Sequence, residues 1–327
     1  MLKLRAIRRF SLLPIGTSAV LLLAACGDTG SGDDRLRLQT DWYAQPEHGG
    51  HYQALATGLY EDAGLDVDIL EGGPNALPLQ RVAGSRVEFG FSRADDVITA
   101  IDRGMPLVMV AAYLQHDPQA LMLHAGDPAE SWSDLDGRRV MAMPGSAWID
   151  YLEHTHGIEL EIVSLDYGLG RFLADPEMIQ QCFVSNQPFH ARREGAEVET
   201  WLIADSGYDP PHVVFTHRDF LENHPETVAV FVEASIRGWE DYLDNDPAPA
   251  DSLILGRNAQ MSPEFIAFAR EILTKRHLVT GDPEEGAEIG RLDPGRMATL
   301  LADMRKIGLI ESDLTVDEVM ADVLALP

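Results

Sequence analysis

Strand-like and helix-like hydrophobic patterns take turns along the chain from residue 35 onwards. Residues 35–42 alternate between apolar and polar positions with period two, as in a half-buried strand. Residues 50–63 then place apolar side chains at helical spacing, and Gly64 closes this helix. The alternation continues with predicted strands at 65–70, 87–91 and 107–112 and predicted helices at 76–83 and 94–103. Such a βαβ series predicts a mostly parallel sheet flanked by helices.

A second series of strand and helix patterns begins near residue 127. Its predicted strands are residues 139–143, 161–165, 182–184 and 199–204, with a helix at 146–156. After a strand at 213–216 the pattern is helical almost to the end, at 225–243, 262–275, 294–306 and 315–326. This α/β architecture with a helical C-terminal tail predicts two lobes, lobe 1 from residues 35–124 plus 217–327 and lobe 2 from residues 125–216. The cleft between the lobes, at the carboxyl ends of the strands, is the expected binding site.

The first 34 residues have the composition of an export signal and a tether. A basic start, Lys3 to Arg9, precedes an apolar stretch, residues 10–23, that is too short and too interrupted to span a membrane as a helix. We interpret residues 1–25 as a signal peptide and the glycine-rich residues 26–34 as a flexible tether.

The end of this segment determines where the protein is expected to work. Leu-Ala-Ala-Cys, ending at Cys26, resembles a bacterial lipobox, which implies cleavage before Cys26 and acylation of its thiol. The protein is then exported and lipid-anchored to a bacterial membrane, facing the periplasm or the cell exterior. The alternative is an ordinary secretory signal with an incidental cysteine.

The chain is strongly acidic, with 53 Asp and Glu against 25 Lys and Arg and a formal net charge of -28. Such a surface repels phosphate backbones and anionic lipid headgroups, so nucleic-acid partners and electrostatic membrane docking are disfavoured. Cys182 is the second of two cysteines, so lipidation of Cys26 leaves no pair for a disulfide or a cysteine-based zinc site. We expect neither a cofactor nor a bound metal.

A series of motifs resembles a known family. It begins with Asp41-Trp42-x5-His48-x-Gly50-x-Tyr52 and Ala56-Thr57-Gly58-Leu59-Tyr60, and motifs in the same order continue to about residue 310. These motifs resemble the substrate-binding lipoproteins of ABC importers in the nitrate/sulfonate/taurine and thiamine-pyrimidine superfamily, which includes pyrimidine synthase-like proteins. The branch with Asp-Trp and a following His-x-Gly is most similar to the binding proteins for hydroxymethyl- or formylamino-pyrimidine precursors of thiamine.

The resemblance implies a type II periplasmic-binding-protein fold, in which two lobes close on a ligand by hinge bending. It implies a binding protein and not an enzyme. The implied partners are a small-molecule ligand, an ABC-transporter permease and, through it, an ATPase subunit. We expect a monomer.

The candidate ligand residues of lobe 1 follow the ends of its predicted strands. Trp42 and Tyr43 close the first strand and offer faces on which a flat heteroaromatic ring can stack, although Trp42 has the alternative of a core position. His48, in the same loop, is either a hydrogen-bond partner of such a ring or a helix cap. Asn75, then Ser92 and Arg93, then Tyr113 follow the next three strands in turn. For Ser92 and Arg93 the alternative is capping of the next helix.

In lobe 2 the candidates are polar or aromatic residues after predicted strands. Ser146 opens a helix whose amides suit a polar group, and Trp148 supplies a second ring face or packs in the core. Ser185, Asn186 and Gln187 place a hydroxyl and two amides in a row, and Asp205 and Tyr208 complete the set. In the resembling family a carboxylate often stands at the position of Gln187, whereas glutamine both donates and accepts hydrogen bonds.

These residues favour a small heteroaromatic ligand over a compact oxyanion, because rings predominate and Arg93 is the obvious cation among them. The predicted function is capture of a thiamine-precursor pyrimidine, such as hydroxymethylpyrimidine or formylaminopyrimidine, for an ABC importer. Riboflavin, an alkanesulfonate or taurine, and nitrate are alternative ligands.

Two functions of other classes remain. The first is an enzyme like the fungal pyrimidine synthases, because the resemblance includes His48, which those enzymes consume as the source of the pyrimidine. Their cysteine-rich, iron-associated motif is absent from this sequence. The second is a sensory or surface-interaction role as an orphan binding protein.

Overall fold

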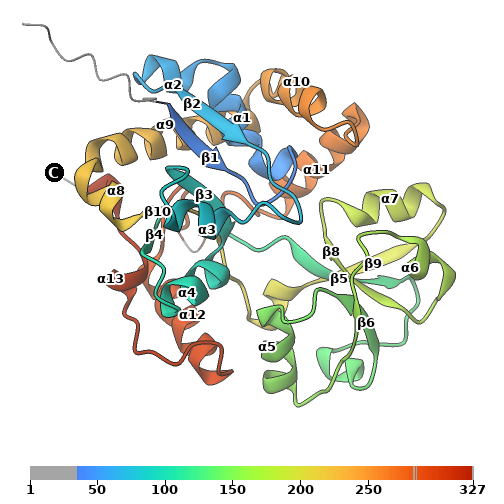
Figure 1. The fold of residues 1–327 in the computed structure, drawn as a ribbon. Coiled ribbons are helices and arrows are strands. Elements are labelled where there is room, and N and C mark those ends of the chain that lie inside the picture. Colours follow the sequence, from blue (N-terminus) through green and yellow to red (C-terminus); the bar gives the residue numbers. More distant parts are fainter. Residues whose placement is uncertain (1–34, 283, 285, 326–327) are drawn as a thin grey trace, which may run out of the picture. The chain divides into compact units, whose positions relative to one another are not determined.

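The structure is a computed structural model that describes residues 35–282, 284 and 286–325. The predicted signal peptide, the tether and the lipidation site at Cys26 lie outside the described residues. From Arg35 onwards the chain forms one compact unit that contains two five-stranded sheets. The chain passes from the first sheet to the second after strand β4, Leu107–Leu114, and returns before strand β10, His212–His217 (Figure 1).

The first sheet consists of β1 (Leu36–Gln39), β2 (Val67–Leu70), β3 (Phe89–Arg93), β10 and β4, in the order β2-β1-β3-β10-β4. Strand β1 is parallel to β2 and β3, with Leu36 opposite Val67 and Leu38 opposite Phe89. The carboxyl ends of these strands therefore lie at one edge of the sheet. Every residue of β3 and β4 is buried, as expected for strands covered on both faces.

The second sheet consists of β5 (Gln119–His124), β6 (Arg139–Ala142), β7 (Glu161–Ser164), β8 (Ile179–Phe183) and β9 (Val198–Leu202), in the order β7-β6-β8-β5-β9. Strand β6 is parallel to β7 and β8, with Val140 opposite both Ile162 and Ile179. The loops that follow β6, β7 and β8 correspond to the loops that follow β1, β2 and β3 in the first sheet. Both sets carry residues of the candidate site.

One strand in each sheet runs against the others. Strand β10 is antiparallel to β3 and β4, and β5 is antiparallel to β8 and β9. The expected pair of mostly parallel sheets is thus confirmed, with one reversed strand in each. The predicted lobe boundaries, at 124/125 and 216/217, differ from the strand pairing, because residues 119–124 pair in the second sheet and 212–217 in the first. Each crossing segment is followed directly by a strand of the sheet that the chain enters. The hydrophobic pattern of a strand does not indicate with which sheet it pairs.

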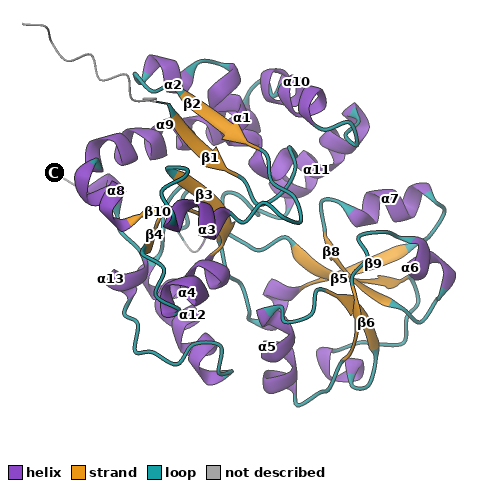
Figure 2. Cartoon of the chain, viewed as in Figure 1, coloured by secondary structure: helices purple, strands orange, loops and turns teal. Residues whose placement is uncertain are grey.

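Helices flank both sheets and make up most of the chain after β10 (Figure 2). Helix α9 packs against α1, α2 and β4, so the helical tail completes the cover of the first sheet. The helices before β10 are α1 (Gly49–Ala56), α2 (Leu59–Asp62), α3 (Pro78–Ala83), α4 (Ala94–Asp102), α5 (Ala147–His156), α6 (Gly170–Ala174) and α7 (Gln187–Arg193). Those after it are α8 (Arg218–Asn223), α9 (Pro225–Asp244), α10 (Ala248–Arg257), α11 (Pro263–Lys275), α12 (Pro294–Lys306) and α13 (Val316–Val319). Among the described residues, 3-10 helices are found at η1 (Pro46–His48), η2 (Trp132–Leu135), η3 (Ile203–Ser206) and η5 (Val323–Ala325).

Several elements differ from the sequence-based prediction, three of them for reasons that the structure shows. The helix expected over 50–63 is split into α1 and α2, because Gly58 takes a left-handed conformation with φ 79°. The helix expected over 315–326 is reduced to α13 and η5, since Met320 leaves it to bridge Met109 of β4. Strand β5 was not expected, because its residues are almost all buried and show no apolar–polar alternation.

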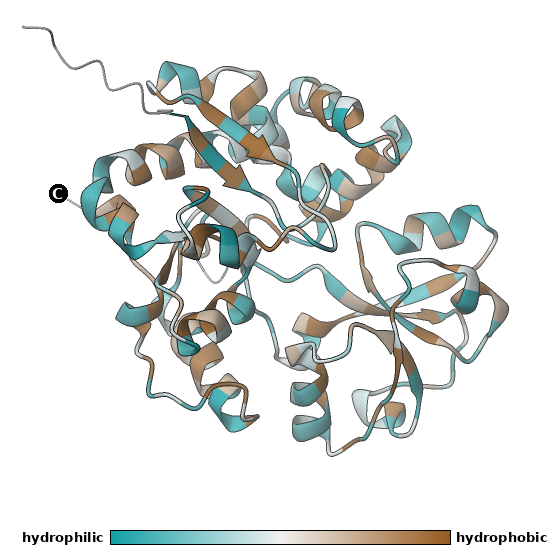
Figure 3. Ribbon diagram, viewed as in Figure 1, coloured by the Kyte–Doolittle hydropathy of each residue, from teal (hydrophilic) through white to brown (hydrophobic). Residues whose placement is uncertain are grey.

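Apolar positions recur along the strands of both sheets and on one side of the longer helices (Figure 3). The side chains of Trp148, Trp239 and Tyr113 are among the largest that are fully buried. Within the described part of the chain, no helix is both long enough and apolar enough to cross a membrane.

Candidate functional site

The first part of the site is the loop between β1 and η1. The carboxylate of Asp41 in this loop accepts a hydrogen bond from His48, with 2.9 Å between Oδ1 and Nε2. The side chain of His48 is buried, whereas that of Asp41 is 29% exposed. Burial acts to raise the pKa of Asp41, but the hydrogen bond from His48 and the charges of His48 and His212 outweigh it, and the pKa is lowered. Asp41 is therefore an accessible, ionised carboxylate held against a histidine.

His48 has one ring nitrogen to spare. Because ionised Asp41 can only accept, Nε2 must donate, and Nδ1 of a neutral imidazole then carries a lone pair. That Nδ1 is buried and has no hydrogen-bond partner. His48 stands at the N-cap position of α1, but its side chain makes no capping hydrogen bond. The imidazole packs edge-on against Phe91, with centroids 5.2 Å apart.

Two glycines allow His48 to be buried here. A Cβ atom on Gly49 would lie 2.1 Å from the ring of Tyr242, and one on Gly50 would lie 2.0 Å from the ring of Trp239. Both rings belong to α9. Glycine is therefore required for the start of α1 to approach α9 this closely, and η1, which ends in His48, is buried as a result.

Three aromatic side chains form an exposed part of the site. The ring of Trp42 contacts those of Tyr43 and Tyr167, at a centroid distance of 5.5 Å in both cases. Tyr43 is 42% exposed and Tyr167 is 47% exposed. Trp42 itself is partly exposed and does not belong to the buried core. Since Tyr167 follows β7, its contact with Trp42 joins the strand ends of the two sheets.

Arg93 is the last residue of β3, and two buried carboxylates neutralise its positive charge. Its guanidinium is bonded to both carboxylate oxygens of Asp95, and its Nε lies 3.7 Å from Asp117. Burial alone would lower the pKa of Arg93, but the charges of Asp95 and Asp117 raise it well above its usual value. Arg93 therefore stays protonated and is 8% exposed.

The network around Arg93 connects the two crossing segments, residues 115–118 and 207–211. Asp117 accepts a hydrogen bond from the backbone N–H of Gln119 at 3.0 Å and lies 3.3 Å from Nε2 of His212. The hydroxyl of Tyr208 donates to Asp95 at 2.8 Å. Arg93 and Tyr208 both contact Asp95, and both are engaged in this buried network.

Glu47 and Ser185 form another contact between the two halves of the site. The Ser185 hydroxyl donates to the Glu47 carboxyl group, and both side chains are buried. Burial raises the pKa of Glu47, although the hydrogen bond from Ser185 opposes this. Glu47 directly precedes His48, so the loop at the end of β8 contacts the same turn that carries the histidine.

Asp96 adds a further acid at the start of α4. Its side chain is exposed, although the charged side chains of Asp95 and Arg93 act on it. Desolvation, followed by the charge of the adjacent Asp95, raises the pKa of Asp96 to about 6, while Arg93 and His212 act in the opposite direction. Together with Asp41, it makes the accessible charge at these strand ends acidic.

The raised pKa of Asp96 predicts a pH-dependent gain of stability in Asp96→Asn. The folded chain binds this proton more tightly than the unfolded chain, so the cost of Asp96 is absent at low pH, grows as the pH rises through about 4 to about 6, and is constant above. At about pH 7.5 we expect the variant to unfold with up to about 1 kcal/mol more free energy than wild type, a value reduced for solvent screening. Urea unfolding at about pH 4 and pH 7.5 measures the difference.

Asp150→Asn, at an exposed position on α5, is the control for loss of one surface charge. A stability gain of Asp96→Asn that is equal at both pH values would contradict the assigned cause.

Several predicted site residues lie on the surface or in the core. Asn75 and Asp205 are exposed. Trp148 and Tyr113 are fully buried, so their rings face the core and offer no face to a ligand. For Trp148 the core alternative is therefore correct, and the hydroxyl of Tyr113 donates to the carbonyl of Val232 at 3.1 Å.

The other predicted polar residues are engaged locally or lie at element ends. Ser146 donates to the carbonyl of Met143 at 2.9 Å, and the side chain of Gln187 accepts from the backbone N–H of Phe183 at 2.8 Å. Ser92 is buried within β3, and Asn186 is half-buried at the start of α7. Of the predicted residues, Trp42 contacts Tyr43, whereas His48 and Ser185 contact Asp41 and Glu47 of the same loop.

Sequence reasoning did not single out several residues of the site, among them Asp41, Glu47, Asp117 and Tyr167. Asp41 and Glu47 lie in the same motif as Trp42 and His48, and this proximity was the available signal. Asp117 precedes a proline between two buried strands and has the pattern of an ordinary turn residue. Tyr167 stands in a loop whose conformation has no distinctive sequence signal.

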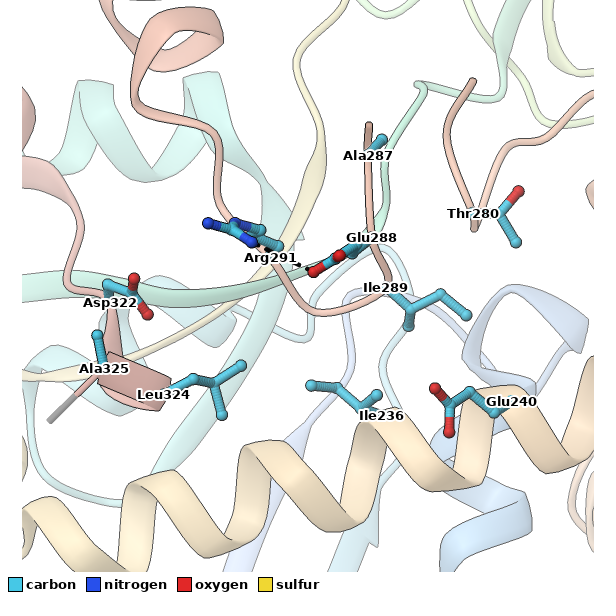
Figure 4. A pocket seen from close by; sticks show the side chains of 10 residues that line it. All are labelled: Ile236, Glu240, Thr280, Ala287, Glu288, Ile289, Arg291, Asp322, Leu324 and Ala325. Carbon is cyan, nitrogen blue, oxygen red and sulfur yellow. Dashed lines mark hydrogen bonds and ion pairs between the residues drawn. The ribbon is translucent and has the colours of Figure 1, made fainter. Parts of the chain in front are cut away.

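A cavity of about 700 Å³ lies elsewhere in the described chain, between α9, the segment before α12 and η5 (Figure 4). An ion pair between Glu288 and Arg291, 3.3 Å apart, lies on its wall. Its lining residues, none of them predicted from the sequence, are Ile236, Glu240, Thr280, Ala287, Glu288, Ile289, Arg291, Asp322, Leu324 and Ala325.

Among the described residues, no group of three or more His, Cys, Asp or Glu is placed to hold a metal ion. His51, near His48 in the sequence, points into the core, where its ring contacts Tyr113 at 4.7 Å. Burial, together with the charge of His48, lowers the pKa of His51 to about 3, so this imidazole is neutral.

Comparison with known sequences identifies similar proteins. Residues 45–250 match the family described as NMT1/THI5 like. The chain is 24% identical to the formylaminopyrimidine-binding protein of Halalkalibacterium halodurans, over 78% of this chain and 82% of that protein. It is 27% identical to the riboflavin-binding protein RibY of Chloroflexus aurantiacus, over 68% and 66%. It is 22% identical to the 4-amino-5-hydroxymethyl-2-methylpyrimidine phosphate synthase of Schizosaccharomyces pombe, over 75% and 72%.

Comparison with solved structures confirms the fold. A putative periplasmic sulfonate-binding protein, SsuA from Methylobacillus flagellatus, superposes with a TM-score of 0.62 at 13% identity. The match covers 89% of this chain and 92% of that protein. The expected periplasmic-binding-protein fold is therefore correct.

Proposed function

The chain belongs to the NMT1/THI5-like family, and on this premise we propose that it is the extracytoplasmic substrate-binding component of an ABC importer. It captures a small, flat heteroaromatic ligand that bears amino groups, in the class of hydroxymethylpyrimidine and formylaminopyrimidine. The ligand lies between the strand ends of the two sheets, at Trp42, Asp41 and His48. A relative matched over 78% of this chain is named for binding formylaminopyrimidine, which supports this class.

The observation that carries the proposal is the chemistry of the groups around Trp42. Asp41 offers an ionised carboxylate, and His48 offers Nδ1, which accepts a hydrogen bond when the imidazole is neutral. An aminopyrimidine presents N–H donors in the plane of its ring, and such acceptors bind them. The partly exposed indole of Trp42 offers the face on which that ring stacks.

Arg93 argues against an anionic ligand. Its guanidinium is already neutralised by Asp95 and Asp117, both of them 1% exposed. The accessible carboxylates of Asp41 and Asp96 would repel a sulfonate or nitrate. Alkanesulfonates, taurine and nitrate therefore rank below neutral or cationic rings.

Riboflavin is the second candidate ligand. A relative matched over 68% of this chain is named for binding it, and its ring system is likewise flat. A relative named as a pyrimidine phosphate synthase also matches most of the chain. We assign His48 a binding role, because its imidazole is hydrogen-bonded to Asp41 and its other ring nitrogen, Nδ1, has no hydrogen-bond partner.

We further propose that the protein is exported and anchored by lipid at Cys26. The lipobox-like sequence before Cys26 supports this, and the family supports a permease and its ATPase as partners. The protein acts as a monomer.

A ligand panel tests the proposed function. The chain from Gly27 onwards is unfolded and refolded to remove any bound ligand, and its thermal unfolding is measured with hydroxymethylpyrimidine, formylaminopyrimidine, thiamine, riboflavin, taurine, an alkanesulfonate and nitrate. A ligand at about 100 times its dissociation constant stabilises a protein by about 2.7 kcal/mol, which gives a clear shift. We expect stabilisation by at least one of the two pyrimidines. Stabilisation by sulfonates or nitrate alone would overturn the ligand class, and stabilisation by riboflavin alone would favour the second candidate.

A further inference from the structure

Large exposed apolar side chains gather at the strand ends that carry the site. Tyr43 and Leu77 follow β1 and β2 in the first sheet, and Met143 and Tyr167 follow β6 and β7 in the second. They are between 42% and 57% exposed. Exposed apolar groups that gather in one region mark binding surfaces more often than scattered ones do. These four therefore direct attention to the edge where both sheets present the loops after their parallel strands.

Tyr167 also has an unusual backbone. Its φ angle of 61° lies in the left-handed region, where a residue with a Cβ atom is strained. The surrounding loop is fixed by hydrogen bonds: Gly168 N–H donates to Asp166 at 2.9 Å, and the Gln180 side chain donates to the Gly168 carbonyl at 3.1 Å. Tyrosine is thus held in a conformation that glycine would adopt more easily.

The strained tyrosine points its ring at the first sheet. Its ring and that of Trp42 have centroids 5.5 Å apart and planes inclined by 31°. Trp42 contacts Tyr43 edge-on at the same distance, with an angle of 73°. The two tyrosines therefore border the indole, one from each sheet, and Tyr167 lies against it at the smaller tilt.

We propose that Tyr167 is a ligand-contacting residue of the second half of the site, and that its ring lies beside the flat ligand at Trp42. The inference rests on the proposed function and deepens it, because it assigns the second half of the site a residue that recognises an aromatic ring. The strained conformation is kept because it turns the tyrosine ring toward the ligand.

Tyr167→Gly separates a binding role from a structural one. The refolded chain from Gly27 onwards is titrated calorimetrically with hydroxymethylpyrimidine, and its melting temperature without ligand is recorded. We expect the affinity to fall about tenfold, because the ring contact and the apolar area are lost. The melting temperature stays equal or rises, because glycine accepts the left-handed φ without strain. Tyr167→Phe keeps the ring and should bind within about twofold of wild type.

Ser85→Gly is the matched control, because Ser85 is exposed and has a φ of 51° in the turn before β3. It relieves the same kind of strain and should leave the affinity unchanged. Wild-type affinity in Tyr167→Gly would overturn this inference while the proposed function stands, provided that wild type binds hydroxymethylpyrimidine. A wild-type chain that binds no hydroxymethylpyrimidine would overturn the role of Tyr167 together with the pyrimidine assignment.

Discussion

Trp42→Ala is expected to weaken the binding of hydroxymethylpyrimidine by about 30- to 150-fold. The loss corresponds to about 2 to 3 kcal/mol, which combines the apolar area that the ring and the indole bury with the stacking energy. Trp42 is partly exposed and lies outside the buried core, so folding should be nearly unaffected. Isothermal titration calorimetry on the refolded chain measures the change in affinity, and circular dichroism checks the fold.

Trp201→Ala is the matched control for Trp42→Ala. Trp201 is also partly exposed, and its ring contacts another tryptophan, Trp132, at 5.3 Å, but it lies on β9 at the edge of the second sheet. Its loss should leave the affinity at the wild-type value. Equal affinities in the two tryptophan variants would contradict the stacking role of Trp42 and would favour a ligand held by hydrogen bonds alone.

Much of the fold follows from local pattern. Strand β3 and helix α4 were expected at 87–91 and 94–103 and are found at Phe89–Arg93 and Ala94–Asp102. Helix α9, expected at 225–243, spans Pro225–Asp244. These elements have a clear apolar periodicity and bounded ends, such as Pro225 at the first helical position, so the information lies in neighbouring residues.

The pairing of strands depends on contacts that are distant in sequence, and it was not predicted in full. Strand β10 pairs between β3 and β4, although it follows both by more than 90 residues in the sequence. The sequence of its six residues does not indicate these partners. Strand β5 is buried along most of its length, so it lacks the alternation by which an edge or half-exposed strand is recognised. The lobe boundaries derived from the sequence were displaced for the same reason.

The candidate site was likewise predicted only in part. The sequence indicates which residues follow a strand, and Trp42, His48 and Ser185 were found in this way. It does not indicate which way a side chain points within a new element. Trp148 is the second residue of α5 and turns into the core, although its neighbour Ser146 stays at the helix start.

The partners of Arg93 could not be predicted, because they come from different segments of the chain. Asp95 is two residues away, but Asp117 lies in the crossing segment between β4 and β5. Sequence reasoning therefore counted Arg93 as a cation available to a ligand, and the folded chain neutralises it. The neutralised Arg93 therefore strengthens the preference for a heteroaromatic ligand over an oxyanion, which the sequence already indicated.

Asp117→Ala is expected to lower the free energy of unfolding by about 3 kcal/mol, because it leaves buried charged and polar partners without their acceptor. Asp117 is 1% exposed and serves Arg93, His212 and the backbone N–H of Gln119. Arg93 keeps its bonds to Asp95, which places the loss at the lower end of the range for broken buried ion pairs. Urea unfolding at neutral pH measures it.

Two variants test the cause of this loss in unfolding free energy. They show whether it arises because the charge is buried or because the residue lies in a segment that crosses between the sheets. Asp117→Asn keeps the shape and an acceptor oxygen for Gln119, so about half of the loss should remain. Asp209→Ala removes a carboxylate from the other crossing segment, where it contacts His116 at 2.7 Å and Arg296 at 2.9 Å. Its side chain is 21% exposed, so water can replace it and the loss should be about 1 kcal/mol. Equal losses for Asp117→Ala and Asp209→Ala would contradict this account, because the crossing segments would then depend on each carboxylate alike, whatever its exposure to water.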